Sequence, residues 1–186
     1  NPAWFIPVVG NILVPVGAMQ FASASIGWFF FSIGLVFWLL LFTIVIYRLF
    51  FHPPLMKLLE PTLFILIAPP AVGFLAYMAL NQQQIDPFAL VLYNIGLFLT
   101  ILLLSRFRQF IKVPFALSWW AYTFPIAAMT MASLLFYEIE KSPFHLYVGA
   151  LLFLGLTVLV FHLFFKTVLA VKNRQLCKPH PAPTNH

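Results

Sequence analysis

Charged residues are scarce in this sequence. Only 8% of its 186 residues are Asp, Glu, Lys or Arg, whereas 63% are hydrophobic. A soluble domain of this size needs a larger charged share, because its surface must remain hydrated. The composition therefore indicates an integral membrane protein that is all α-helical, with the lipid bilayer as its surroundings.

Cysteine and clustered catalytic side chains are also rare. Cys177 is the single cysteine, so a disulfide framework is excluded. The sequence shows no paired carboxylates, no metal-ligand spacing among its histidines and no glycine-rich phosphate loop, so we expect neither an enzyme nor a cofactor. Ser118, Ser133 and His145 could be combined into an intramembrane protease site. Transmembrane serines, however, usually bond to helix backbones, which makes this interpretation weak.

Long apolar runs make up most of the chain. A helix needs about 20 apolar residues to cross the bilayer core, and the sequence predicts six spans, at residues 4–25, 27–47, 58–80, 87–104, 113–136 and 144–166. We expect short connections near Ser25–Gly27 and Tyr137–Pro143, which make consecutive spans antiparallel neighbours. Residues 1–172 would form one transmembrane domain, and the proline-containing segment 173–186 a disordered tail. Asn1 is not expected to be the biological start, because the first span lacks the features of a signal peptide.

The basic residues predict the orientation in the membrane. Nine of the ten fall in segments that the six spans place on one side: Arg48, Lys57, Arg106, Arg108, Lys112, Lys166, Lys172, Arg174 and Lys178. Because positive loops stay in the cytoplasm, both chain ends are expected there, in a cell membrane. This asymmetry explains the net charge of +6 without a nucleic-acid partner.

Prolines recur at a nearly constant interval. The distances from Pro7 to Pro61 and from Pro61 to Pro114 are 54 and 53 residues, and Pro15, Pro69 with Pro70, and Pro125 form a second series. Such a period indicates a repeated supersecondary unit, here three tandem helical hairpins of one proline-broken and one straight helix. Broken helices belong where protein or water surrounds the backbone. We therefore expect Pro15, Pro69 and Pro125 to kink inner helices that line a path.

The spans carry no charged residue deep in the membrane, whereas proton-coupled pumps normally need buried Asp, Glu or His. A channel or facilitative transporter is therefore favoured, and helix breaks with a basic rim suit an anion. A proton-coupled secondary carrier and a non-transporting membrane scaffold remain the alternatives.

Three segments resemble a known family: PAWFIPVVGNILVP at residues 2–15, EPTLFILIAPPAVG at 60–73 and FALSWWAYTFP at 115–125. Together they are similar to the tellurite-resistance and dicarboxylate transporter family, which includes the slow-type anion channels of plant guard cells. The resemblance implies ten helices in five hairpins around a central pore, with kinked helices inside and straight helices outside. It also implies a homotrimer. The six spans correspond to the last six of the ten helices, so two hairpins are absent from this sequence.

The resemblance also implies site residues. Phe124, immediately before Pro125, matches the phenylalanine that closes the pore in the family. Asn11, Thr62 and Ser118 are candidate pore-lining positions, although interhelical hydrogen bonds explain them equally well. The permeating species would be a small inorganic anion such as chloride or nitrate, or a C4-dicarboxylate such as malate. A link to tellurite resistance is left open.

Overall fold

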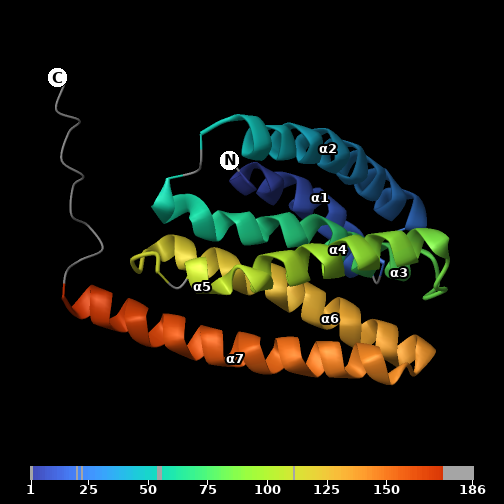
Figure 1. The fold of residues 1–186 in the computed structure, drawn as a ribbon. Helices are drawn as coiled ribbons and strands as arrows, with labels where there is room; N and C mark the ends of the chain where they lie inside the picture. Colours follow the sequence, from blue (N-terminus) through green and yellow to red (C-terminus); the bar gives the residue numbers. More distant parts are fainter. Residues whose placement is uncertain (1, 20, 22, 54–55, 111, 174–186) are drawn as a thin grey trace.

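A computed structural model describes residues 2–19, 21, 23–53, 56–110 and 112–173. Within these residues the chain is helical and contains no strand. Figure 1 shows the helices lying roughly alongside one another in one bundle. Cys177 and nearly all of the predicted tail 173–186 lie outside the described residues.

Three of the helical rods begin as a 3-10 helix and continue as an α-helix. They are η1 (Pro2–Trp4) with α1 (Phe5–Ala18), η2 (Lys57–Ile67) with α3 (Ala68–Leu80), and η3 (Leu117–Tyr122) with α6 (Thr123–Glu140). The other three rods are α-helical throughout: α2 (Ala24–Phe51), α4 (Pro87–Ser105) and α7 (Pro143–Lys172). A short helix, α5 (Phe107–Phe110), follows α4. The two kinds of rod alternate along the chain, as the proline pattern predicts.

Five rods are long and apolar enough to cross a membrane, and the rod at Pro2–Ala18 is a shorter apolar helix. This confirms the predicted all-α membrane class. The predicted first connection is wrong, because Ser25–Gly27 lie in the first turns of α2. Gly27 is buried, and a Cβ there would lie 2.8 Å from Leu80 Cδ2. This glycine therefore serves close helix packing rather than a turn.

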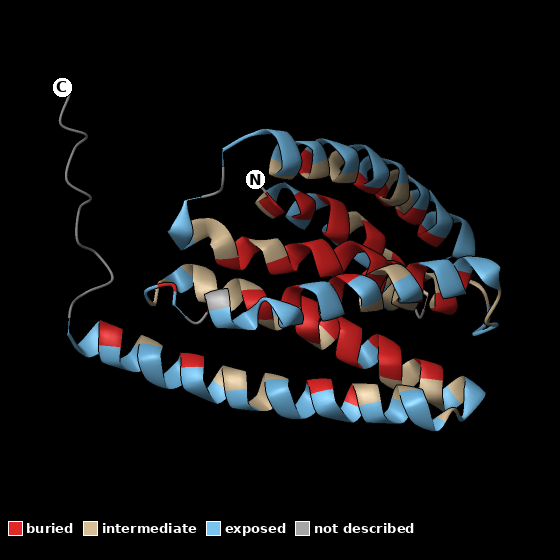
Figure 2. Ribbon diagram, in the orientation of Figure 1, coloured by how far each residue is buried: buried red, intermediate tan, exposed pale blue. Residues whose placement is uncertain are grey.

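The rods that begin as a 3-10 helix form the interior. α3 packs between α1 and α6, and α2, α4 and α7 cover the outside. In the most apolar stretch of the rod Lys57–Leu80, 83% of the residues are buried, against 22% for α2 and 17% for α7. The same contrast is visible in Figure 2, where α2 and α7 are largely exposed and the rod Lys57–Leu80 is largely buried. This arrangement agrees with the expectation that broken helices lie inside and straight helices outside.

Glycines allow each outer helix to approach an inner one. A Cβ added at Gly34 of α2 would lie 2.5 Å from Ile12 Cγ1, and one at Gly149 of α7 would lie 2.7 Å from Leu134 Cδ2. At Gly96 of α4 the nearest atom would be Met129 Sδ, at 3.1 Å. Small residues at helix crossings are the usual means of close packing in membranes. Each of the three hairpins therefore has, on its outer helix, a glycine at a close crossing with an inner helix.

The connections within the hairpins lie at one end of the bundle. The turns between α3 and α4 and between α6 and α7 are at this end, whereas the segments after α2 and α4 are at the other (Figure 1). The N-terminal residues and the end of α7 also lie at that second end. The three hairpins therefore run parallel to one another.

Candidate functional site

A row of exposed side chains runs along the inner helix α6 and the 3-10 turns before it. Leu117, Phe124 and Met131 are 52%, 47% and 57% exposed, and Glu138 is exposed as well. The members are seven residues apart, which is close to two α-helical turns, so the α-helical ones share one face. Pro125 and Ile126, the two residues that follow Phe124, are buried. The row therefore faces away from the packed bundle.

Two members of this row, Met131 and Glu138, line a groove between the inner helices. The groove has a volume of about 350 Å³ and is lined by Val16 of α1, by Leu75, Met78 and Ala79 of α3, by Gln83 and by Met131, Leu134, Leu135 and Glu138 of α6. Gln83 and Glu138 supply its polar side chains, and both belong to the end of the bundle that holds the turns within the hairpins. The groove is thus apolar along its walls and polar at one mouth.

The 3-10 to α transitions share a register with prolines. Pro7, Pro70 and Pro125 each occupy the third residue of an α-helical segment. A proline has no N–H to donate to the carbonyl four residues earlier, so one α-helical hydrogen bond is missing at each of these positions. The preceding turn instead closes with 3-10 bonds, such as that from the Thr123 N–H to the Trp120 carbonyl. In this way Pro125 restricts the backbone next to Phe124.

The predicted kink positions differ in their surroundings. Pro69 and Pro125 lie at the start of an α-helical segment, next to the change of helix type. Pro15 is buried in the interior of α1, where its carbonyl accepts a hydrogen bond from the Met19 N–H at 3.1 Å. In this first rod the change of helix type lies beside Pro7. A kink at Pro15 remains a prediction.

The three candidate polar positions all bond to backbone carbonyls. Asn11 donates to the Pro7 carbonyl at 3.0 Å, and Thr62, which is buried, donates to the Leu59 carbonyl. Ser118 donates from η3 to the Leu58 carbonyl of η2 at 2.6 Å. The Ser118 hydrogen bond links two inner rods. It is an interhelical hydrogen bond, which the sequence left open as the alternative to pore lining. None of the three is among the side chains that line the groove described above.

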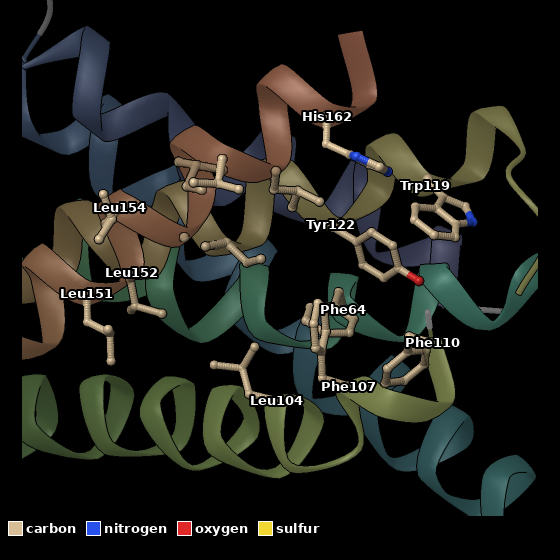
Figure 3. A pocket seen from close by; sticks show the side chains of 15 residues that line it. Phe64, Leu104, Phe107, Phe110, Trp119, Tyr122, Leu151, Leu152, Leu154 and His162 are labelled. Carbon is tan, nitrogen blue, oxygen red and sulfur yellow. The ribbon is translucent and has the colours of Figure 1, made fainter. Parts of the chain in front are cut away.

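A second, larger groove lies on the outer side of η3. Its volume is about 720 Å³, and Figure 3 shows it between leucines of α7 and aromatic side chains such as Phe64, Phe107 and Tyr122. Trp119 and His162 also border it. The adjacent Trp120 bridges to α7 by donating to the Thr167 hydroxyl at 3.1 Å. The tryptophan pair of the third motif therefore supports the packing of η3 against its outer helix.

Sequence reasoning missed Met131, Glu138, Leu75 and Gln83. The first two could have been found by extending the heptad spacing from Phe124 along α6. Leu75 and Gln83 carry no such signal, because their position depends on how α3 lies against α6. Among the described residues, no group of three His, Cys, Asp or Glu side chains is placed to hold a metal ion.

The profile of the voltage-dependent anion channel family SLAC1 matches residues 1–168. The chain belongs to this family. That result confirms the resemblance to the slow-type anion channels and the tellurite-resistance proteins.

Relatives of this anion channel family member come from an archaeon, a plant and a bacterium. An uncharacterised transporter of Methanocaldococcus jannaschii is 30% identical, over 94% of this chain and 55% of the relative. The S-type anion channel SLAH3 of Arabidopsis thaliana is 33% identical over 91% of this chain and 26% of the channel. A tellurite-resistance protein TehA homologue of Haemophilus influenzae is 26% identical over 74% of this chain and 42% of the relative. The chain therefore spans about half the length of the archaeal relative and less of the other two.

Proposed function

We propose that this chain supplies part of the lining of an anion-conducting pathway, in which Phe124 acts as the gate. The observation that carries the proposal is the exposed row on α6, which aligns Phe124 with the groove between the inner helices. Membership of the anion channel family supports an anion as the permeating species. The resemblance to that family also leads us to propose a homotrimer in a cell membrane.

The position of Phe124 suits a gate. Seven residues separate it from Met131, so about 10 Å of helix lie between the ring and the groove. An aromatic ring at a narrow, apolar constriction blocks ions both sterically and by excluding water. Rotation about the side-chain dihedrals moves the ring without any change in the backbone, which Pro125 holds in place. The positive edge of the ring, rather than its negative face, would be directed toward a passing anion.

The lining favours passage over tight binding. Leu117, Phe124 and Met131 are uncharged, and the only fixed charge of the row is Glu138 at the mouth. Conduction requires that an ion enter and leave readily, which a strongly attractive site would prevent. We therefore propose facilitated movement of small anions or of a C4-dicarboxylate such as malate, with no coupling to proton transfer along this row.

Replacement of the Phe124 side chain by alanine tests the proposal directly. Phe124→Ala should raise the macroscopic anion current of the full-length protein by about tenfold, the effect of removing a block of roughly 1.4 kcal/mol. The current is measured by voltage clamp in chloride, nitrate and malate, and surface expression is measured in the same cells.

Phe98→Ala is the matched control. Phe98 is a phenylalanine on the outer helix α4 and is 63% exposed, so its loss should leave the current unchanged. Equal currents in the wild type and both variants would remove Phe124 from the gate. A chain that passes none of the three anions in any variant would contradict the conduction pathway itself.

A further inference from the structure

Among the described residues, Glu138 is the one charged side chain that lines the groove between the inner helices. It lies in the row of Phe124 and Met131, two turns beyond Met131 toward the end of α6. Fourteen residues separate Glu138 from Phe124, which corresponds to about 21 Å of helix. Glu138 therefore lies at the mouth of the groove rather than at the constriction.

Gln83 lies at the same mouth of the groove, in a turn with an unusual backbone conformation. Gln82 and Gln83 have φ angles of 51° and 59°, in the left-handed region that non-glycine residues rarely adopt. The Gln83 N–H donates to the Met78 carbonyl at 2.9 Å, and the Asn81 amide donates to the Gln84 carbonyl at 3.1 Å. These bonds maintain the turn and leave the Gln83 side chain at the groove. A neutral amide and a carboxylate thus share the mouth.

We infer that Glu138 limits the supply of anions to the pathway at this mouth, so that its charge sets unitary conductance but not gating. A carboxylate beside the entrance lowers the local anion concentration by repulsion. Its field falls off over a Debye length of about 10 Å at 0.1 M salt, which is shorter than the distance to Phe124. The charge therefore acts on entry from this mouth and leaves the gate unaffected. This inference rests on the conduction pathway proposed above.

Neutralisation of Glu138 is the first test. Glu138→Gln should raise the unitary conductance for chloride entering from this mouth by about threefold at about 0.1 M salt, because a unit charge acts over several ångströms of water at that Debye length of about 10 Å. At about 1 M salt the Debye length is near 3 Å, and the ratio of variant to wild type should fall to nearly one. The open probability should not change at either salt concentration.

Glu140→Gln is the matched control. Glu140 lies two residues further along α6, which places it about 200° around the helix, and it does not line the groove. Glu140→Gln removes the same charge at nearly the same depth but away from the groove. The unitary conductance of this variant should therefore differ from that of the wild type by less than about 1.3-fold. Gln83→Glu instead adds a negative charge at the mouth and should lower the unitary conductance at low salt.

The outcomes separate the inference from the proposed function. Unitary chloride currents that respond equally to Glu138→Gln and Glu140→Gln would overturn the role of Glu138 while leaving the pathway intact. A threefold change that persists at 1 M salt would also contradict it, because a repulsive surface charge is screened there. Absence of anion current in the wild type and in Phe124→Ala would overturn both.

Discussion

Single residues decide how closely the helices of this bundle approach one another. Gly34 is the clearest case, because a Cβ there would lie 3.0 Å from the Ile12 backbone nitrogen and 3.3 Å from the Val8 carbonyl oxygen. Backbone atoms cannot move aside as a flexible side chain does. The α2 and α1 helices would have to separate to accommodate even a methyl group.

Gly34→Ala is therefore expected to destabilise the protein by about 1–3 kcal/mol, the usual cost of overpacking a tightly packed site. Thermal unfolding of purified protein in detergent measures the effect as a lower Tm. Gly155→Ala is the control, since a Cβ at Gly155 of α7 would meet no atom within 4 Å. Alanine there should be neutral or slightly stabilising, because it favours the helix. Equal Tm values for the two variants would show that the close crossing at Gly34 does not contribute to stability.

The residues of the site differ in how far the sequence reveals them. Phe124 could be singled out because it stands in a specific motif beside a proline that removes a backbone hydrogen bond. Glu138 is indicated only by its heptad spacing from Phe124, and Gln83 carries no signal, since it is an ordinary polar residue near a helix end. Their meeting at one mouth depends on the packing of α3 against α6 and on a left-handed turn that the local sequence does not dictate.

Among the elements, the hairpin of α3 and α4 has the best-defined connection. Asp86 caps α4, because its Oδ1 accepts a hydrogen bond from the Ala89 N–H at 2.9 Å. Its other carboxylate oxygen accepts from the Tyr77 hydroxyl of α3 and from the Asn81 amide. The hydrogen bond from Tyr77, followed by that from Ala89, lowers the pKa of the Asp86 carboxyl below its usual value.

This lowered pKa predicts a pH dependence of stability. The Asp86 contribution is fully present above the unfolded-state pKa of about 3.9 and is lost as pH falls through the lower folded-state pKa. Asp86→Asn keeps a capping oxygen but does not ionise, so its Tm should be lower than that of the wild type at about pH 6 and should approach it only below about pH 3.9, toward about pH 2. Thermal unfolding between about pH 2 and pH 7 provides the measurement. A constant difference in Tm over this range would show that the charge of Asp86 makes no contribution.

The alternation of elements followed from the sequence, whereas some boundaries did not. Proline spacing predicted three broken and three straight rods, and a change of helix type accompanies the missing N–H group at Pro7, Pro70 and Pro125, although not at Pro15 inside α1. Ser25–Gly27 was misassigned because a glycine near a helix start has two uses, a turn or a close crossing. The structure shows the second, with Gly27 facing Leu80 of α3. Sequence alone does not indicate which neighbour approaches a glycine.

At the scale of the whole molecule, three parallel hairpins give the bundle two chemically different ends. The end with the turns inside the hairpins includes Asp86, Glu138 and Glu140, and Lys141 is its basic residue. The opposite end has the segments that carry Arg48, Lys57, Arg106, Arg108 and Lys112. Such asymmetry is typical of membrane proteins whose basic loops are retained in the cytoplasm. An anion would therefore meet a repulsive mouth at one end and an attractive rim at the other.

This asymmetry leads to a prediction about orientation. Gln84 is exposed in the turn between α3 and α4, and Ser105 is exposed at the opposite end of α4. In a Cys177→Ala background, Gln84→Cys should react with a membrane-impermeant maleimide in intact cells, because the positive-inside rule places this turn outside. Ser105→Cys should react only after permeabilisation. The reverse pattern would place the basic end outside, and the acidic mouth at Glu138 would then control anion entry from the cytoplasm rather than from the exterior.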